Sequence, residues 1–308
     1  MQTPLENTPT TYTSVELPKG TSNSLVLLVK AMRPKQWTKN LLLFAAVIFA
    51  QKTFVPGYLL KSFYAFIIFC FLSGSVYLIN DLVDIEKDKL HPIKKNRPLA
   101  SGRIKVSFVV FSAIFITLVS LSCAFFLQPY LGWVALAYFL TTLSYTFKLK
   151  NIVIIDVIVI AIGFICRALA GIVVINVAIS PWLLVCTFLL ALFLALTKRR
   201  HELLLLDEKA HSHREILNEY LPEMLDQMIS VVTSSTVMAY SLYTFTSGHS
   251  VYLMTTIPFV IYGIFRYLYL VHKRDFGGSP EAALLKDPPM LINIILWVVA
   301  CSLILYFG

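Results

Sequence analysis

The 308-residue sequence has few charged residues, which make up only 14% of it, while hydrophobic residues make up 57%. A soluble enzyme needs a more polar surface, so this shortage of charge excludes a soluble fold and indicates a polytopic membrane protein. The five cysteines lack the spacing of a metal site, and we interpret them as packing residues. Residues 1–24 are polar and contain no cleavable apolar segment, so we predict a flexible cytoplasmic tail.

Long apolar runs follow this tail. Each is close to the length that a helix needs to cross a bilayer, which is about 17–25 residues. The sequence therefore predicts an all-α fold, with residues 25–308 forming a single membrane domain of nine transmembrane helices. Gln51 and Lys52 interrupt the first run, which is the least regular of the nine. The predicted spans are roughly 40–57, 62–79, 107–127, 130–147, 152–175, 180–197, 229–246, 251–271 and 290–307.

Lysine and arginine are divided unevenly between the two sides of this arrangement. With the amino terminus placed inside, 22 of the 26 Lys and Arg residues fall in cytoplasmic segments. Only Lys52 and Lys61 fall on the opposite side. This is the positive-inside pattern of membrane proteins, so the net charge of +9 calls for a lipid bilayer and no nucleic-acid partner. We expect the working face of the protein to be cytoplasmic.

Carboxylates gather directly after the second apolar run. On a helix, Asp81, Asp84 and Asp88 stay within about 60° of one another, and Asn80 lies one turn before Asp84. Clustered carboxylates repel unless a cation joins them, and oxygen ligands without Cys or His suit Mg²⁺ or Mn²⁺. We predict a metal site made of Asn80, Asp81, Asp84 and Asp88, with Asp81 and Asp84 as the catalytic pair. The alternative is a solvated loop of mixed charge.

Cationic and polar side chains stand at the same end of other spans. Lys94 and Arg97 can hold phosphate charge next to the metal, and His91 lies beside them. Asp156 is an acid inside a span, which is costly unless it is paired, so it is a site candidate. For Arg33 and Lys35 a purely topological role is the alternative. For Arg167, deep in span five, we favour helix packing or snorkelling. Further candidates are Gln36, Lys39, Tyr145, Lys148, Lys150, Lys198, Arg200 and Glu202.

The motifs resemble the UbiA-type intramembrane prenyltransferase superfamily. The aspartate motif at 80–88 and Tyr-x-x-Lys-x-Lys at 145–150 are similar to that superfamily. Four further motifs are similar to its decaprenyl-phosphate phosphoribosyltransferases. These are Arg-Pro-x-Gln-Trp-x-Lys-Asn at 33–40, His-Pro-x-Lys-x-x-Arg-Pro at 91–98, Lys-Arg-Arg-x-Glu-Leu at 198–203 and Gly-Ser-Pro-Glu-x-x-Leu-Leu-x-Asp at 278–287.

One departure from the prenyltransferase pattern carries information about the substrates. The resemblance implies a second aspartate-rich motif at the end of span six, but cations occupy residues 198–200 here. This favours one metal-diphosphate site and a separate site for a bare phosphate. It suits phosphoribosyl diphosphate (PRPP) as donor and polyprenyl phosphate, either decaprenyl or undecaprenyl, as acceptor.

The resemblance also implies roles and a setting. It implies a metal-dependent transferase in the bacterial inner membrane that supplies an arabinose donor for the cell envelope. The expected donor-binding residues are Lys39, Lys94, Arg97, Tyr145, Lys148 and Lys150, and the expected acceptor-phosphate residues are Lys198 and Arg200. The assignment of each basic cluster to donor or acceptor stays open.

Two other functions remain open as well. A prenyltransferase with an aromatic or quinone acceptor would use the same fold and the same first aspartate motif. A secondary transporter would instead need polar or broken helices at mid-membrane. The oligomeric state is left open too, a homo-oligomer included.

Overall fold

The computed structural model describes residues 23–91, 94–178, 180–204, 215–248, 250–274 and 286–307. All regular secondary structure in these residues is helical, which confirms the all-α prediction for this part of the chain. Six of the described segments are long and apolar enough to cross a membrane. They are α3 (Tyr58–Val83), α5 (Val106–Leu127), α7 (Ile155–Val174), α8 (Pro181–Leu204), η5 (Val251–Thr256) continuing into α10 (Ile257–Lys273), and α12 (Pro288–Phe307).

Two further helices follow predicted spans but are less apolar. They are α6 (Pro129–Phe147) and α9 (Pro222–Thr246). Several serines and threonines of α9 donate hydroxyl hydrogen bonds to carbonyls one turn earlier, Thr233 and Thr236 among them. Such self-satisfied hydroxyls fit an apolar environment, although they lower the mean hydropathy of the segment.

The first predicted span, 40–57, is wrong in its bounds. The helical structure begins at η1 (Pro34–Phe44), continues as α2 (Ala45–Phe49) and then gives way to turns over residues 50–57. Gln51 has a positive φ just after α2 ends, and Gly57 has one where α3 begins, so the backbone between them cannot continue a helix. A 3₁₀ helix rises about 2.0 Å per residue, so these two short helices together extend about 30 Å, close to the hydrocarbon thickness.

The first segment packs tightly on α7. A Cβ added to Gly171 would lie 2.2 Å from the Leu43 carbonyl oxygen, so only glycine permits this close approach. One turn earlier on α7, the Arg167 side chain donates hydrogen bonds to Asn40 Oδ1 at 2.8 Å and to the Tyr138 hydroxyl at 2.9 Å. Arg167 is buried, so its role is packing, in agreement with the sequence interpretation.

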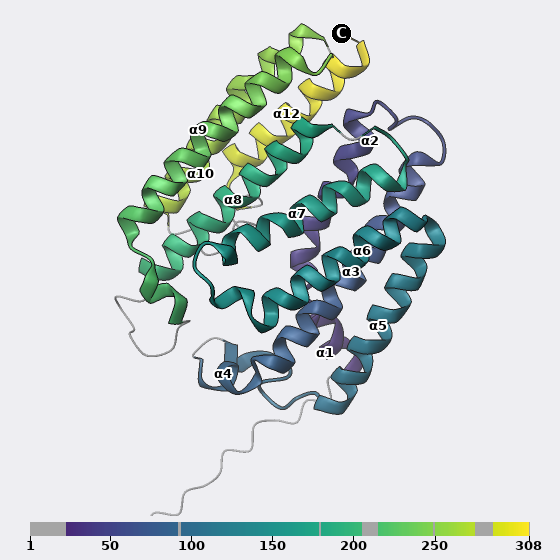
Figure 1. Ribbon diagram of the computed structural model, residues 1–308, viewed down its shortest axis with the longest axis vertical. Helices are drawn as coiled ribbons and strands as arrows, with labels where there is room; N and C mark the ends of the chain where they lie inside the picture. Colours follow the sequence, from purple (N-terminus) through teal and green to yellow (C-terminus); the bar gives the residue numbers. More distant parts are fainter. Residues whose placement is uncertain are drawn as a thin grey trace, which may run out of the picture.

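Successive helices from α5 to α9 lie side by side, so that α7 stands between two groups (Figure 1). One group holds α3, α5 and α6, and the other holds α8, α9, α10 and α12. Each has its own buried apolar cluster, one around Phe69 and Leu131 and the other around Phe193 and Tyr267. Cys70, Cys166 and Cys301 are buried among these helices, and Cys123 is exposed.

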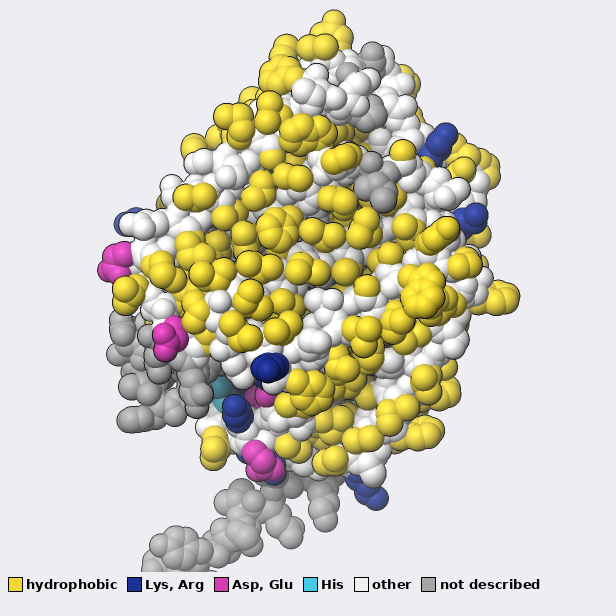
Figure 2. All heavy atoms as spheres, viewed as in Figure 1, with side chains coloured by type: hydrophobic (Ala, Val, Ile, Leu, Met, Phe, Trp, Pro, Cys, Tyr) yellow, Lys and Arg dark blue, Asp and Glu magenta, His cyan; other side chains and the backbone are white. Residues whose placement is uncertain are grey.

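The two ends of the molecule differ in chemistry. The lower end in Figure 1 carries α1 (Ser24–Ala31) and α4 (Ile85–Leu90), and the upper end carries α2 and the end of α12. Figure 2 shows a broad apolar middle, with acidic and basic side chains toward the lower end and the left edge and some cations at the upper right edge. This apolar band between polar ends is the surface of a multi-pass membrane protein.

Candidate active site

The predicted carboxylates lie at and just beyond the carboxyl-terminal end of α3. Asp81 is only 3% exposed, and its Oδ1 forms ion pairs with Arg33 and, at 3.2 Å, with Arg97. Arg97 also binds the buried Asp88. A single guanidinium therefore joins Asp81 of α3 to Asp88 of α4. The two acids lie on separate helices, because the helix on which their spacing places them is interrupted at Asp84.

Asp84 is held from another direction. It separates α3 from α4, and its carboxylate accepts a hydrogen bond at 2.8 Å from Lys150 Nζ in η3 (Leu149–Asn151), the turn between α6 and α7. Lys150 is buried, whereas Lys148, two residues earlier, is exposed. The structure thus separates two lysines that the sequence placed together in one cluster.

The acids are matched by cations in number. Asp81, Asp84 and Asp88 face Arg33, Arg97 and Lys150, so the local formal charge is balanced. Within the described ranges, no three acidic, histidine or cysteine side chains gather closely enough to form a metal site by themselves. Magnesium usually takes only one or two carboxylates and completes its octahedron with substrate phosphates and water. The oxygen donors of Asp81 and Asp84 fit that requirement.

The remaining candidate residues of this region lie around the carboxylate cluster. Asn80 is half-buried, and its carbonyl accepts the Asp84 amide at 3.0 Å. His91 Nδ1 accepts the backbone amide of Lys94 at 3.3 Å, which fixes the start of the loop after α4. The side chains of Gln36, Lys39 and Lys94 are partly exposed. Residues 92 and 93 lie outside the described part, as do residues 278–285 of the last motif.

A second network forms where α6, α7 and α8 meet. Its centre is Arg199, 3% exposed, whose Nε donates to Asp156 Oδ2 at 2.6 Å. The same guanidinium binds Glu202 and donates to the Tyr145 hydroxyl at 3.0 Å. Three candidates from separate parts of the sequence, Tyr145, Asp156 and Glu202, are therefore brought together by a residue that was not singled out.

Tyr220 closes this network from the segment before α9. Its hydroxyl donates to Asp156 Oδ1 at 2.7 Å and accepts the amide of Ile154, also at 2.7 Å. Burial and the adjacent carboxylate raise the pKa of Tyr220, so the neutral hydroxyl persists as a donor at physiological pH. The Asp156 carboxylate, fully buried, thus has a partner on each oxygen.

The two cations predicted to bind the acceptor phosphate have different surroundings. Arg200 pairs with Asp226 of α9, with nitrogen–oxygen distances of 2.5 and 3.1 Å. Lys198 is 44% exposed, and its Nζ lies 3.9 Å from Glu202, a loose contact. Of the two, Lys198 is the more exposed, since the Arg200 side chain is only 15% exposed.

Helical phase is the signal that could have identified Arg199. Ala191, Ala195 and Arg199 follow one another at four-residue spacing and are all buried, so Arg199 continues the inward face of α8. Asp226 and Tyr220 had no comparable signal, because their contacts join segments that the sequence does not show to be neighbours.

Arg33 is the other residue whose role sequence reasoning left open. It has φ 55 and ψ 66, the left-handed region that a side chain rarely adopts, and the strain costs on the order of 1–3 kcal/mol. Its guanidinium carbon lies 4.8 Å from the centroid of the Tyr77 ring and its Nη2 contacts Asp81. The strained backbone therefore directs a cation at the carboxylate cluster.

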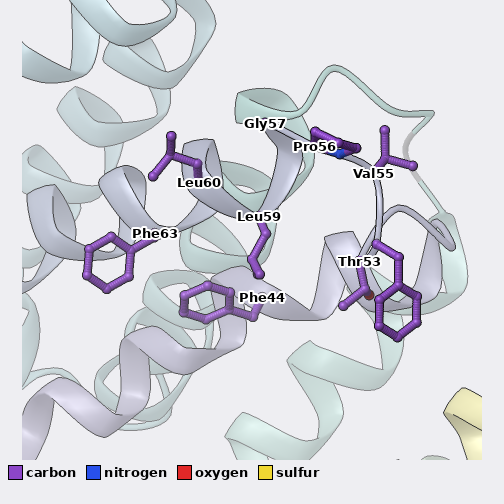
Figure 3. A pocket seen from close by; sticks show the side chains of 9 residues that line it. Phe44, Thr53, Val55, Pro56, Gly57, Leu59, Leu60 and Phe63 are labelled. Carbon is purple, nitrogen blue, oxygen red and sulfur yellow. The ribbon is translucent and has the colours of Figure 1, made fainter.

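Two pockets lie at opposite ends of α3. The polar one, about 300 Å³, is lined by Lys30, Ala31, Arg33, Asp81, Asn96, Arg97 and Pro98. The other, about 540 Å³, is lined by residues 53–57 and by apolar side chains that include Phe44, Leu60 and Phe63 (Figure 3). Leu60 precedes Asp81 by 21 helical positions, about 30 Å of helix, so the apolar pocket is remote from the carboxylates.

These features, an all-helical membrane fold with acids and cations at one end, define an intramembrane transferase class. The chain belongs to the UbiA prenyltransferase family, whose family model matches residues 41–295. It is 33% identical to the decaprenyl-phosphate phosphoribosyltransferase of Corynebacterium glutamicum over 294 residues, 91% of this chain and 86% of that protein. It is 32% identical to the protein of the same name from Mycolicibacterium smegmatis, with 91% and 93% covered.

Solved structures share the fold. A UbiA homolog from Archaeoglobus fulgidus bound to GPP and Mg²⁺ has a TM-score of 0.69 and 19% identity, covering 91% of this chain and 99% of that one. A structure of a UbiA homolog from the same organism bound to Cd²⁺ has a TM-score of 0.67 and 20% identity. The chain therefore has the UbiA fold.

Proposed function

We propose that the protein transfers phosphoribose from PRPP to a polyprenyl phosphate, giving polyprenyl-phosphoryl-5-phosphoribose and diphosphate. The observation that carries this proposal is similarity at 32–33% identity, over nine tenths of the chain, to decaprenyl-phosphate phosphoribosyltransferases. The basic end of α8, where the resemblance would place acids in a prenyltransferase, supports a bare phosphate as the acceptor.

The carboxylate cluster at the end of α3 is the proposed donor site. Asp81 and Asp84, with Asn80 and Asp88 in support, would hold Mg²⁺ or Mn²⁺, since their hard oxygen donors suit these ions. When bound, the metal neutralises the diphosphate and improves it as a leaving group. Lys150 and Arg97, now paired with acids, are positioned to exchange part of that pairing for phosphate oxygens.

The reaction forms one bond and breaks one. An oxygen of the lipid phosphate bonds to ribose C1 while the bond from C1 to the diphosphate oxygen breaks, and the electron pair leaves with diphosphate. The phosphate is already anionic, so the chain needs no strong general base and must supply orientation and charge stabilisation. Lys198, exposed at the end of α8, is the proposed contact for the lipid phosphate, with Arg200 anchored beside it.

We further propose nine membrane passes, a cytoplasmic amino terminus and a site at the cytoplasmic face of a bacterial inner membrane. Support comes from the 22 of 26 Lys and Arg residues on one side of the predicted topology. The roughly 30 Å length of η1 and α2 and the membrane-scale lengths of α6 and α9 support passes beyond the six apolar ones.

The test is an assay of the purified protein with two substrate pairs. We expect labelled product from PRPP and polyprenyl phosphate with Mg²⁺ present, and none from prenyl diphosphate and an aromatic acid. Uncharged polyprenol should be inert because it lacks a ready nucleophile. Asp81→Asn or Asp84→Asn should lose at least about two orders of magnitude in rate, the scale of one lost charge-stabilising group. Activity only with the prenyl diphosphate pair would assign the chain to aromatic prenylation instead.

A further inference from the structure

The polar pocket beside Asp81 contains two cations, Lys30 and Arg33, to which the proposed reaction gives no role. It is lined by Lys30 from the end of α1, Arg33 from the strained link to η1, and Asn96 and Arg97 from the loop after α4. Asp84 and Lys150 lie outside its lining. The pocket therefore extends from one side of the carboxylate cluster, away from the lysine that holds Asp84.

Its charge fits a small dianion. Lys30, Arg33 and Arg97 contribute three positive charges, and Asp81 in the lining and Asp88, which pairs with Arg97, contribute two negative ones, so the formal charge at the pocket is +1 before a ligand binds. A phosphate monoester carries about −1.5 to −2 at pH 7 and offers three acceptor oxygens. Two guanidinium groups and one ammonium group supply the donors that such a group requires.

Its size and rigidity fit the same ligand. At about 300 Å³ the cavity is at the lower end of ligand pockets, too small for a long prenyl chain. The backbone around it is anchored by a buried apolar cluster that includes Leu28 of α1, Met32 at the end of that helix, Leu78 of α3 and Leu99 after the loop. The pocket is thus held in place by packing before any ligand binds.

We infer that this pocket binds the 5-phosphate of the donor, the monoester at the opposite end of the sugar from the diphosphate. The inference rests on the proposed function and identifies the feature of this chain that selects a sugar phosphate. A prenyl diphosphate has no such second phosphate, so the pocket would favour PRPP over the donors of ordinary prenyltransferases. Asp81 stands between the two phosphate sites, and Arg33 and Arg97 contact it from the pocket side.

Lys30 is the residue to change, because it lines the pocket without an assigned role in holding the acids. The matched control is Lys35→Gln, which removes the same charge from an exposed lysine of the neighbouring η1 outside the pocket lining. Lys30→Arg is the conservative variant that keeps the cation. Two inhibitors of PRPP turnover serve as probes: ribose 5-phosphate, which carries only the monoester, and inorganic diphosphate, which carries only the leaving group.

We expect Lys30→Gln to raise the inhibition constant of ribose 5-phosphate and the KM for PRPP by about tenfold or more, the loss of one charge-assisted hydrogen bond. The inhibition constant of diphosphate and kcat should change less than twofold. Lys30→Arg should stay near wild type for both probes, and so should Lys35→Gln. An equal change for both probes, an equal effect of Lys35→Gln, or no inhibition of the unaltered protein by ribose 5-phosphate would overturn the inference alone. If the unaltered protein failed to use PRPP, the proposed function itself would be overturned.

Discussion

Among the ion pairs at the charged end of the molecule, the pair between Asp156 and Arg199 should lower the stability most when one partner is replaced. Replacing Asp156 by Asn keeps the shape but removes the charge that faces Arg199 at 2.6 Å, in a place where neither side chain is more than 3% exposed. Breaking a buried pair by removing one partner costs about 3–5 kcal/mol, because the other charge stays buried. Arg199 keeps Glu202 as a second partner, so we expect a loss of about 3 kcal/mol, the lower bound. At about 2–4 °C per kcal/mol, the apparent Tm should fall by roughly 6–12 °C.

The assay is thermal unfolding of the purified protein in detergent, with two comparison variants. Asp226→Asn removes a pair of the same type from Arg200, but Asp226 is 44% exposed, so the loss should be about 1 kcal/mol or less. The double variant Asp156→Leu with Arg199→Met removes both buried charges and should recover most of the stability.

The transferase activity of the same variants tests the role of this ion pair independently of stability. Arg199 also holds the Tyr145 hydroxyl, so the double variant should remain slow even when its Tm recovers. A Tm for Asp156→Asn within about 2 °C of wild type would show that the pair does not hold α7 to α8. A double variant no more stable than the single one would contradict the idea that an unpaired charge causes the loss.

Three further predictions follow from single contacts. Lys198→Gln should raise the KM for polyprenyl phosphate by about tenfold or more, whereas Arg200→Gln should mainly lower Tm. Equal KM changes for the two variants in a lipid titration would refute this difference between the two cations. Gly171→Ala should cost about 1–3 kcal/mol, because its methyl would meet the Leu43 carbonyl, and an unchanged Tm would refute that close contact. The hydrogen bond from Arg266 holds the pKa of Asp287 below its ordinary value. The resulting stabilisation is complete above about pH 4 and is lost as the pH falls through the lowered pKa. The Tm difference between wild type and Asp287→Asn should therefore shrink below about pH 4. A Tm difference that does not depend on pH would count against this linkage.

The helical fold could be predicted because the membrane imposes it on each apolar run separately. A run of about twenty apolar residues has to satisfy its own backbone hydrogen bonds, so the predicted and observed bounds differ by at most a few residues at α5, α6 and α12. The bounds of the first segment, formed by η1 and α2, could not be predicted in this way. Its polar residues and its 3₁₀ geometry depend on α7, and no local pattern predicts a distant partner.

The site was predictable where its residues are close in the sequence and unpredictable where several helices meet. Asp81 and Asp88 lie seven residues apart across the junction of α3 and α4, and Arg97 joins them in the structure. The contacts of Arg199 and Lys150 cross between segments 43 and 66 residues apart. The charge pattern predicts which end of the molecule holds the site. Packing between helices determines which cation of each cluster is buried, and the sequence does not show that packing.

The unusual first segment also sets a requirement for how the protein is made. Its polar residues Lys35, Gln36, Lys39 and Asn40 disfavour stable insertion of the segment by itself. The Asn40 amide donates to Ser73 of α3, whereas its carbonyl oxygen accepts from Arg167, which lies 127 residues later on α7. At about 5–20 residues per second, that partner emerges on the order of ten seconds after the segment itself. The segment that begins beside the carboxylates can therefore pack on α3 early, but its buried contacts are complete only when α7 has been made.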